Sequence, residues 1–126
     1  MSLLQFTPEL IVADVDKSVD FYINILGFEK IEGDSHFACL RAGTSEIMLM
    51  LKSDFDQEIP DLNRPQNSGW SILNIEVSDI KTLHENLENK VSICRSFRKT
   101  DYGTEEFTVT DLDGYLIQLT QRFVTW

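Results

Sequence analysis

The side chains that could do chemistry are thinly spread in this sequence. The two histidines, His36 and His84, belong to no cluster of metal ligands, and the cysteines Cys39 and Cys94 lack the spacing of a zinc or redox motif. There is no glycine-rich phosphate loop and no recognisable nucleophile motif. The carboxylates are dispersed, whereas paired acid and base catalysis needs two of them in one pocket. The sequence therefore offers no evident catalytic set.

Net charge narrows the choice of partners. The 126 residues include 21 Asp and Glu against 11 Lys and Arg, a formal net charge of −10. This charge disfavours nucleic acid, whose phosphates need clustered cations, and an anionic membrane surface. It suits a cationic small molecule or a basic partner, or else serves only solubility. No stretch is apolar enough to span a bilayer and no secretion signal is visible, so we expect a cytoplasmic protein with two buried free thiols.

Apolar periodicity predicts the elements that must position any site. The first half is predicted to form a strand over 6–13, a helix over 15–26 and three strands over 28–32, 37–42 and 46–52. The second half is predicted to form a strand over 70–77, a helix capped by Asp79, a strand over 91–98 and a hairpin over 106–111 and 115–121. Residues 53–69, with Pro60 and Pro65 and no clear period, are predicted to be a linker or a flexible flap.

The two halves align with each other. Residues 12–15 resemble residues 77–80 at an offset of 65, and residues 37–51 match 107–121 at an offset of 70. The second offset matches Phe37 with Phe107 before each hairpin, and whether their side chains face inward depends on the length of the turns, which the sequence leaves open. Internal duplication is the economical account, although two units of one pattern could also agree by pattern alone.

Two stretches carry a family resemblance. Asp-Val-Asp-Lys-Ser-Val-Asp-Phe-Tyr at 14–22, followed by Leu-Gly-Phe at 26–28, resembles the opening signature of the glyoxalase/bleomycin resistance/dioxygenase superfamily (vicinal oxygen chelate fold). Residues 102–119 are similar to the end of its bleomycin-resistance branch, with Asp-Leu-Asp-Gly at 111–114 in place of the commoner Asp-Pro-Asp-Gly.

The resemblance covers about residues 5–122 and implies an α+β fold. Two βαβββ modules in tandem, about 5–52 and 70–122 and joined by a linker over 53–69, would form curled mixed sheets around a groove, with helices on the outer face. Members of this size are usually homodimers with the groove at the subunit interface.

The resemblance also implies where a metal would bind. Enzymes of the superfamily place His, Glu or Gln at four positions, which correspond here to Thr7, Met48, Ile72 and Gln118. A hydroxyl, a thioether, an alkyl group and an amide do not make a site for a catalytic metal. Shifting the alignment by one or two residues would bring Glu9 or Asn74 near this site, but it would bring no histidine there. We therefore predict no metal and no cofactor.

Strand alternation predicts the lining of the groove. With Met48 and Gln118 turned inward, the opposite parity of both strands is aliphatic, as expected for a face packed under helices. Glu9, Glu46 and Glu76 are the carboxylates that this parity allows into the groove, unless they are only rim charges. The predicted ligand-binding residues are aromatic or lie at the centre of the groove: Trp70, Tyr102, Phe107, Met48, Gln118 and Phe37.

Three functions remain open from the sequence. The leading hypothesis is a metal-free, bleomycin-resistance-like homodimer that sequesters a small cationic or aromatic ligand, with aromatic contacts of about 0.5–2 kcal/mol each. The alternative is a metal-dependent lyase, isomerase or ring-cleaving dioxygenase. A third is a structural or regulatory dimer whose groove is filled by its own residues 53–69.

Overall fold

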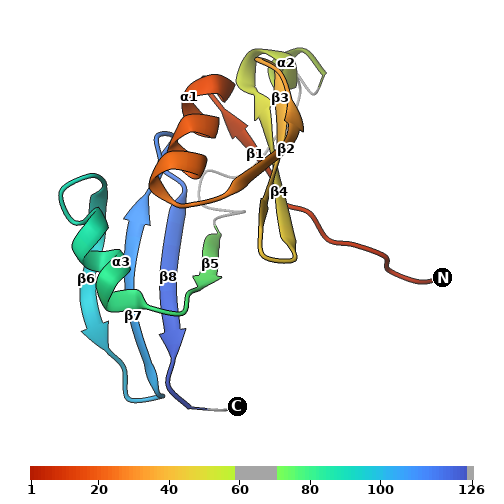
Figure 1. The fold of residues 1–126 in the computed structure, drawn as a ribbon. Helices are drawn as coiled ribbons and strands as arrows, with labels where there is room; N and C mark the ends of the chain where they lie inside the picture. Colours follow the sequence, from red (N-terminus) through yellow and green to blue (C-terminus); the bar gives the residue numbers. More distant parts are fainter. Residues whose placement is uncertain (59–70, 125–126) are drawn as a thin grey trace. The chain divides into compact units, whose positions relative to one another are not determined.

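The chain forms two compact units, Met1–Arg64 and Pro65–Trp126, in a computed structural model that describes residues 1–58 and 71–124 (Figure 1). Each unit contains one four-stranded mixed sheet, so the predicted α+β class is confirmed. In each sheet the first strand of the unit runs parallel to the last strand, and the other neighbours are antiparallel. No helix among the described residues is long and apolar enough to cross a membrane.

The first unit has the sheet order β1-β4-β3-β2. Its elements in chain order are β1 (Glu9–Val12), α1 (Val15–Asp20), the π-helical turn η1 (Phe21–Ile25), β2 (Glu29–Gly33), β3 (Phe37–Ala42), β4 (Ser45–Leu51) and α2 (Lys52–Glu58). Pro8 directly precedes β1, and β1 lies at the edge of the sheet, where the missing N–H group of proline interrupts no ladder of hydrogen bonds.

The second unit repeats this arrangement with the order β5-β8-β7-β6. Its elements are β5 (Ile72–Glu76), α3 (Ile80–Leu87), β6 (Ser92–Lys99), β7 (Thr104–Thr110) and β8 (Leu116–Arg122). Asp79 caps α3 as predicted, because its carboxylate accepts the N–H of Thr82. The plan of strand, helix and three strands is therefore confirmed in both units.

The core of each unit lies between its helix and one face of its sheet. In the first unit Leu49 is fully buried and Ile47 nearly so, and in the second unit Ile117 and Leu119 are buried on the matching strand. Burying such a side chain contributes roughly 1.5–3 kcal/mol each. The predicted aliphatic parity of β4 and β8 is confirmed, and the opposite parity of each strand forms what we call the open face of its sheet.

The helix predicted over 15–26 is not uniform. Asp14 caps its start by accepting the N–H of Lys17 at 3.0 Å, but the last turn widens into η1. Tyr22 is buried there and meets Phe28 edge-on, with ring centroids 5.3 Å apart. Phe21 at the start of η1 is also buried, and its ring meets that of Tyr22 edge-on, with centroids 5.6 Å apart.

The two hairpins differ in register, which corrects the offset assigned from sequence. Only two residues separate the paired Ala42 and Ser45, whereas residues 111–115 separate Thr110 from Leu116. The offset of 70 therefore holds for β4 and β8 but falls by one residue for β3 and β7. As a result the counterpart of Phe37 is Glu106, not Phe107, and the two phenylalanines lie on opposite faces of their sheets.

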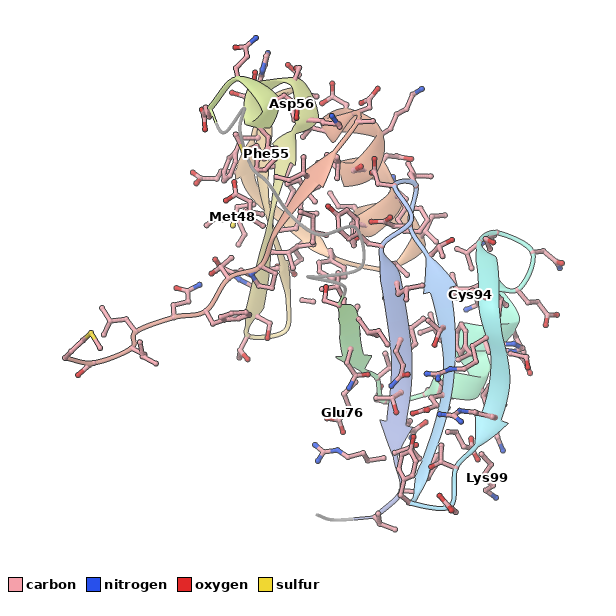
Figure 2. The ribbon with its side chains drawn as sticks, turned by 180° about the vertical axis from the view of Figure 1, so that it is seen from behind. Met48, Phe55, Asp56, Glu76, Cys94 and Lys99 are labelled. Atoms are coloured by element: carbon pink, nitrogen blue, oxygen red, sulfur yellow. The ribbon has the colours of Figure 1, made fainter. Side chains whose placement is uncertain are left out.

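Two smaller expectations were also wrong. The start of the segment predicted as a linker is helical: α2 carries a Lys52–Asp56 ion pair of 2.6 Å and is tied to His36 through Asp54. The remainder, residues 59–69, lies outside the described residues. Cys94 is exposed rather than buried, because β6 is an edge strand with register shifts around this residue (Figure 2), whereas Cys39 is buried and both thiols are free.

Candidate functional site

A polar cavity of about 350 Å³ opens on the open face of the second unit. We call it the β8 cavity; it is lined by Asn74, Glu76, Tyr102, Thr104, Glu106, Gln118, Thr120 and Arg122. These residues come from alternate positions of β5, β7 and β8 and from the turn before β7. Strand alternation predicted Gln118 and Glu76 on this face, and both lie there together with Asn74 and Thr120.

Glu106 is the buried centre of this cavity. Its side chain is 2% exposed, yet each of its oxygens is hydrogen-bonded. Oε1 accepts from Arg98 at 2.6 Å and from the Tyr102 hydroxyl at 3.1 Å. Oε2 accepts from the hydroxyls of Thr104 and Thr120 at 3.2 and 3.4 Å. The carboxylate is held in one position by partners on every side.

These contacts keep Glu106 ionised. Burial alone raises the pKa of a carboxyl group, but the hydrogen bonds from Arg98, Tyr102 and Thr104 outweigh it, so that the pKa of Glu106 lies below its ordinary value. The hydrogen bond to Glu106 raises the pKa of Arg98 in turn. A carboxylate that is both ionised and saturated with donors is poorly suited to act as a general base.

A second ion pair stands at the end of β5. Arg122 donates through Nε and Nη2 to the two oxygens of Glu76, each at 2.8 Å, and Glu76 is labelled in Figure 2. The hydrogen bond from Arg122 lowers the pKa of Glu76. Glu76, predicted as a lining carboxylate, is therefore neutralised by Arg122 through two hydrogen bonds.

A third arginine reaches Gln118. Arg95 on β6 donates from Nη2 to Oε1 of Gln118, and the Gln118 amide nitrogen donates to Asn74 at 3.2 Å. Arg95 also lies 3.9 Å from Oε1 of Glu106. The amide that stands at a predicted metal position is therefore held by its neighbours at both ends.

The structure brings together only part of the predicted site. Gln118 and Tyr102 both line the β8 cavity, and Tyr102 is 50% exposed. Phe107 does not line it: this ring is fully buried on the helix-covered face, with its centroid 4.9 Å from that of His84 on α3. The change of register in β7 is the reason. His84 is therefore a packing residue, with its ring against those of Phe97 and Phe107 and its side chain 23% exposed.

The remaining predicted residues belong to the first unit or lie outside the described residues. Met48 on β4 (Figure 2) and Phe37 on β3 are half-buried on one face of their sheet, where Phe37 pairs with Met50 and Met48 with Cys39. Glu46 joins this face and approaches Sγ of Cys39 to 3.6 Å. Trp70 lies outside the described residues.

The four predicted metal positions do not fit a divalent cation. Thr7 and Met48 in the first unit offer a hydroxyl and a thioether, and Ile72 in the second offers no donor atom. The remaining oxygen ligand, Oε1 of Gln118, already accepts from the guanidinium of Arg95, whose charge opposes a metal ion there. Among residues 1–58 and 71–124, no three His, Cys, Asp or Glu side chains gather closely enough to bind a metal.

Sequence reasoning missed Glu106, Arg95 and Arg98. The match of Phe107 with Phe37 left the inward face of this strand open, and Glu106 was not among the carboxylates expected in the groove. The alternation of Thr104, Glu106 and Thr108 with two apolar residues was a usable signal, because period-two patterns separate the faces of a strand. The register shifts in β6 that bring both arginines near Glu106 have no comparable signal.

Known proteins are similar to this chain in both sequence and fold. The profile of the Glyoxalase/Bleomycin resistance protein/Dioxygenase superfamily matches residues 3–119. The chain is 28% identical over 130 residues to the bleomycin resistance protein of Geobacillus stearothermophilus, covering 95% of this chain and 98% of that protein. A Staphylococcus aureus protein of the same name matches with the same identity and coverage.

Two solved structures are similar to this fold. A protein of unknown function from Agrobacterium tumefaciens has a TM-score of 0.80 at 19% identity, covering 98% of each chain. The bleomycin-binding protein of Streptomyces verticillus, complexed with copper(II)-bleomycin, has a TM-score of 0.65 at 28% identity, covering 96% of this chain and 98% of that one. The profile match, the repeated βαβββ arrangement and these likenesses together show that the chain belongs to the Glyoxalase/Bleomycin resistance protein/Dioxygenase superfamily.

Proposed function

We propose that this protein binds and sequesters a small organic molecule without metal-assisted chemistry. The relatives named bleomycin resistance proteins support this assignment, as does the similar structure that holds copper(II)-bleomycin. These relatives make a drug of the bleomycin class the first ligand to test. The fold alone would not decide the matter, because one fold serves many activities.

The observation that carries the proposal is the contact between Arg95 and Gln118. In a metalloenzyme of this superfamily, the position of Gln118 would present a free oxygen to a cation. Here that oxygen accepts a hydrogen bond from a guanidinium, and the carboxylate nearest to it, Glu106, is saturated by other donors. These side chains can bind and orient a polar ligand, but they supply neither a metal ligand nor an available base.

The first unit offers a complementary kind of surface. One face of this sheet carries Glu46, Met48 and Met50 from alternate positions of β4. Phe37 on β3 pairs with Met50 and lies on the same face. An aromatic ring and two thioethers favour a flat apolar group, and a carboxylate favours a cation. Taken by itself, this surface of the first unit supports the aromatic or cationic ligand that was expected from the sequence.

The proposal includes a homodimer. Leu3, Leu4 and Phe6 precede β1 and are 92%, 92% and 87% exposed, an apolar run that a second copy of the chain would cover. Sedimentation equilibrium should give twice the chain mass of 14.5 kDa. A replacement of all three residues by serine should shift the protein toward the monomer. A wild-type protein that sediments as a monomer would refute the dimer.

Calorimetric titration with bleomycin, metal-free and copper(II)-loaded, tests the binding function. We expect saturable binding at micromolar or lower concentration, with the drug recovered unaltered by mass spectrometry. Glu46→Gln should weaken binding of this cationic drug several-fold. Glu85→Gln, which removes the same charge from the exposed side of α3, should not. Chemical conversion of the drug would contradict sequestration, and an absence of heat at high micromolar drug would remove bleomycin as the ligand.

A further inference from the structure

Three side chains form a row across the open face of the second unit. Arg95 on β6 pairs with Thr108 on β7, and Thr108 pairs with Gln118 on β8. Because Arg95 donates to Gln118 from the far side of Thr108, its side chain passes over the threonine. Thr108 is 4% exposed, and its hydroxyl has no hydrogen-bond partner among the described residues.

A buried hydroxyl without a hydrogen-bond partner is unfavourable, and a bound ligand that accepts a hydrogen bond from it would remove this cost. Thr108 shares its face with Gln118, which lines the β8 cavity. Arg95 and Thr108 do not line the cavity themselves, but both adjoin its lining residue Gln118, and the side chain of Arg95 is 43% exposed. A turn of this one side chain would expose the Thr108 hydroxyl and the Arg95 donors to the same bound group.

The charges around the cavity indicate the charge of the ligand group that would bind there. Arg98 binds Glu106 at 2.6 Å and Arg122 binds Glu76 at 2.8 Å, so these four charges cancel in pairs. Arg95 is left 3.9 Å from a carboxylate oxygen that Arg98 already occupies. Among the described residues around the cavity, one positive charge therefore remains, although the whole chain carries −10. One surplus charge balances a carboxylate, which is a monoanion, better than a phosphate monoester, which carries nearly two charges.

We propose that the β8 cavity binds the carboxylate group of a small organic ligand through Arg95 and Thr108. Arg95 turns from Gln118 to the carboxylate, and the Thr108 hydroxyl donates to it. Gln118 is released to bond a neighbouring polar atom of the ligand. A guanidinium is suited to this task because its planar donors match the two oxygens of a carboxylate. The assignment rests on the proposed small-molecule binding and makes its ligand anionic at this end, in contrast to the cation expected from net charge.

Three isosteric probes test the assignment: benzoate, the neutral benzamide and the cationic benzamidine. Each is titrated into the intact ¹⁵N-labelled protein, and backbone amides of 95, 108 and 118 and arginine Nε–H signals are followed by NMR. We expect benzoate to shift these signals with a dissociation constant of about a millimolar, which is ordinary for so small a ligand. Benzamide and benzamidine should bind at least about tenfold more weakly.

Two variants and one control identify the residues. Arg95→Gln should weaken benzoate binding by about tenfold or more, because a charged donor is lost. Thr108→Val should weaken it several-fold without lowering the melting temperature, because the hydroxyl has no hydrogen-bond partner within the described part of the free protein. Lys90→Gln, which removes the same charge from an exposed turn after α3, should leave the affinity unchanged.

The outcomes separate this assignment from the proposed function. Equal binding of benzamide or benzamidine at the same residues would overturn the carboxylate and leave small-molecule binding intact. Unchanged benzoate affinity in Arg95→Gln would overturn the assignment to Arg95, and a loss of stability in Thr108→Val would show that the hydroxyl already has a partner. If no probe shifts these signals at tens of millimolar, the assignment fails, and the bleomycin titration still decides the proposed function.

Discussion

Arg98 holds Glu106 through two donors that converge on one oxygen, Nε at 3.2 Å and Nη2 at 2.6 Å from Oε1. The carboxylate is buried, and the guanidinium is 45% exposed. One end of the pair, Arg98 on β6, is therefore in contact with solvent, and the other end, Glu106, lines the β8 cavity. Removing the cation would leave a buried anion with hydroxyl, amide and more distant guanidinium donors only.

Arg98→Met is therefore expected to destabilise the protein by about 1–3 kcal/mol, the cost of a lost partner for a buried charged group. Chemical denaturation measures this change. Arg41→Met provides the control, because Arg41 pairs with Glu46 at 3.8 Å near the surface and such pairs contribute about 0–1 kcal/mol. Equal losses in the two variants would show that the Arg98–Glu106 contact is no stronger than a surface pair.

Acid should weaken the fold through Glu106. The pKa of this group is lower in the folded protein than in the unfolded chain, so the unfolded chain binds more protons as the pH falls. Its stabilisation is complete above the unfolded pKa of about 4.3 and is lost as the pH falls through the folded pKa. Glu106→Gln should flatten the dependence of unfolding free energy on pH below about pH 5. A wild-type slope in the variant would contradict this account.

The fold and one face of the site could be predicted from the sequence, because period-two alternation in β4 and β8 is strict. The aliphatic Ile117 and Leu119 fix the helix-covered face, and Gln118 between them must then lie on the open face. The site on β7 could not be predicted in the same way. Its face depends on the length of the loop over 111–115, and sequence similarity to the shorter hairpin of the first half gave the wrong register.

The amino-acid composition also did not reveal that the site is rich in arginine. Net charge describes the whole surface, whereas Arg95, Arg98 and Arg122 gather around two carboxylates on one sheet. Long side chains cross neighbouring strands, so strand parity alone does not locate their charged ends. The helix α2 was missed for a related reason, since it buries no side chain and is held by polar contacts.

His36 and Asp54 provide a second pH-dependent contact, between the start of β3 and α2. Nδ1 of His36 lies 2.7 Å from Oδ2 of Asp54, and this hydrogen bond raises the pKa of His36 above its ordinary value. The contact stabilises the fold below the unfolded pKa of about 6.5 and is lost as the pH rises through the folded pKa. An NMR titration should show the raised pKa in wild type, a lower pKa in Asp54→Asn and no change in Asp56→Asn. Equal His36 pKa values in wild type and Asp54→Asn would refute the contact.

Gly33 is required where β2 turns toward β3. Its φ is +146°, and an added Cβ would lie 2.5 Å from both the Ala38 Cα and the Phe37 carbonyl oxygen. Gly33→Ala should therefore cost more than about 2 kcal/mol, because backbone must shift. Gly43→Ala, at φ +61° with open space around it, should cost about 1 kcal/mol. Similar losses in the two variants, measured by urea denaturation, would show that the backbone at Gly33 yields easily.

We expect the superfamily's four metal positions, Thr7, Met48, Ile72 and Gln118 in this chain, to hold no divalent ion. Equilibrium dialysis of the purified protein against Ni²⁺, Zn²⁺ and Mn²⁺, followed by elemental analysis, tests it most directly. The account predicts far less than one ion per chain, and the same low content in Gln118→Ala. One tightly held ion per chain in the wild type that is lost in Gln118→Ala would contradict it and favour a metalloenzyme.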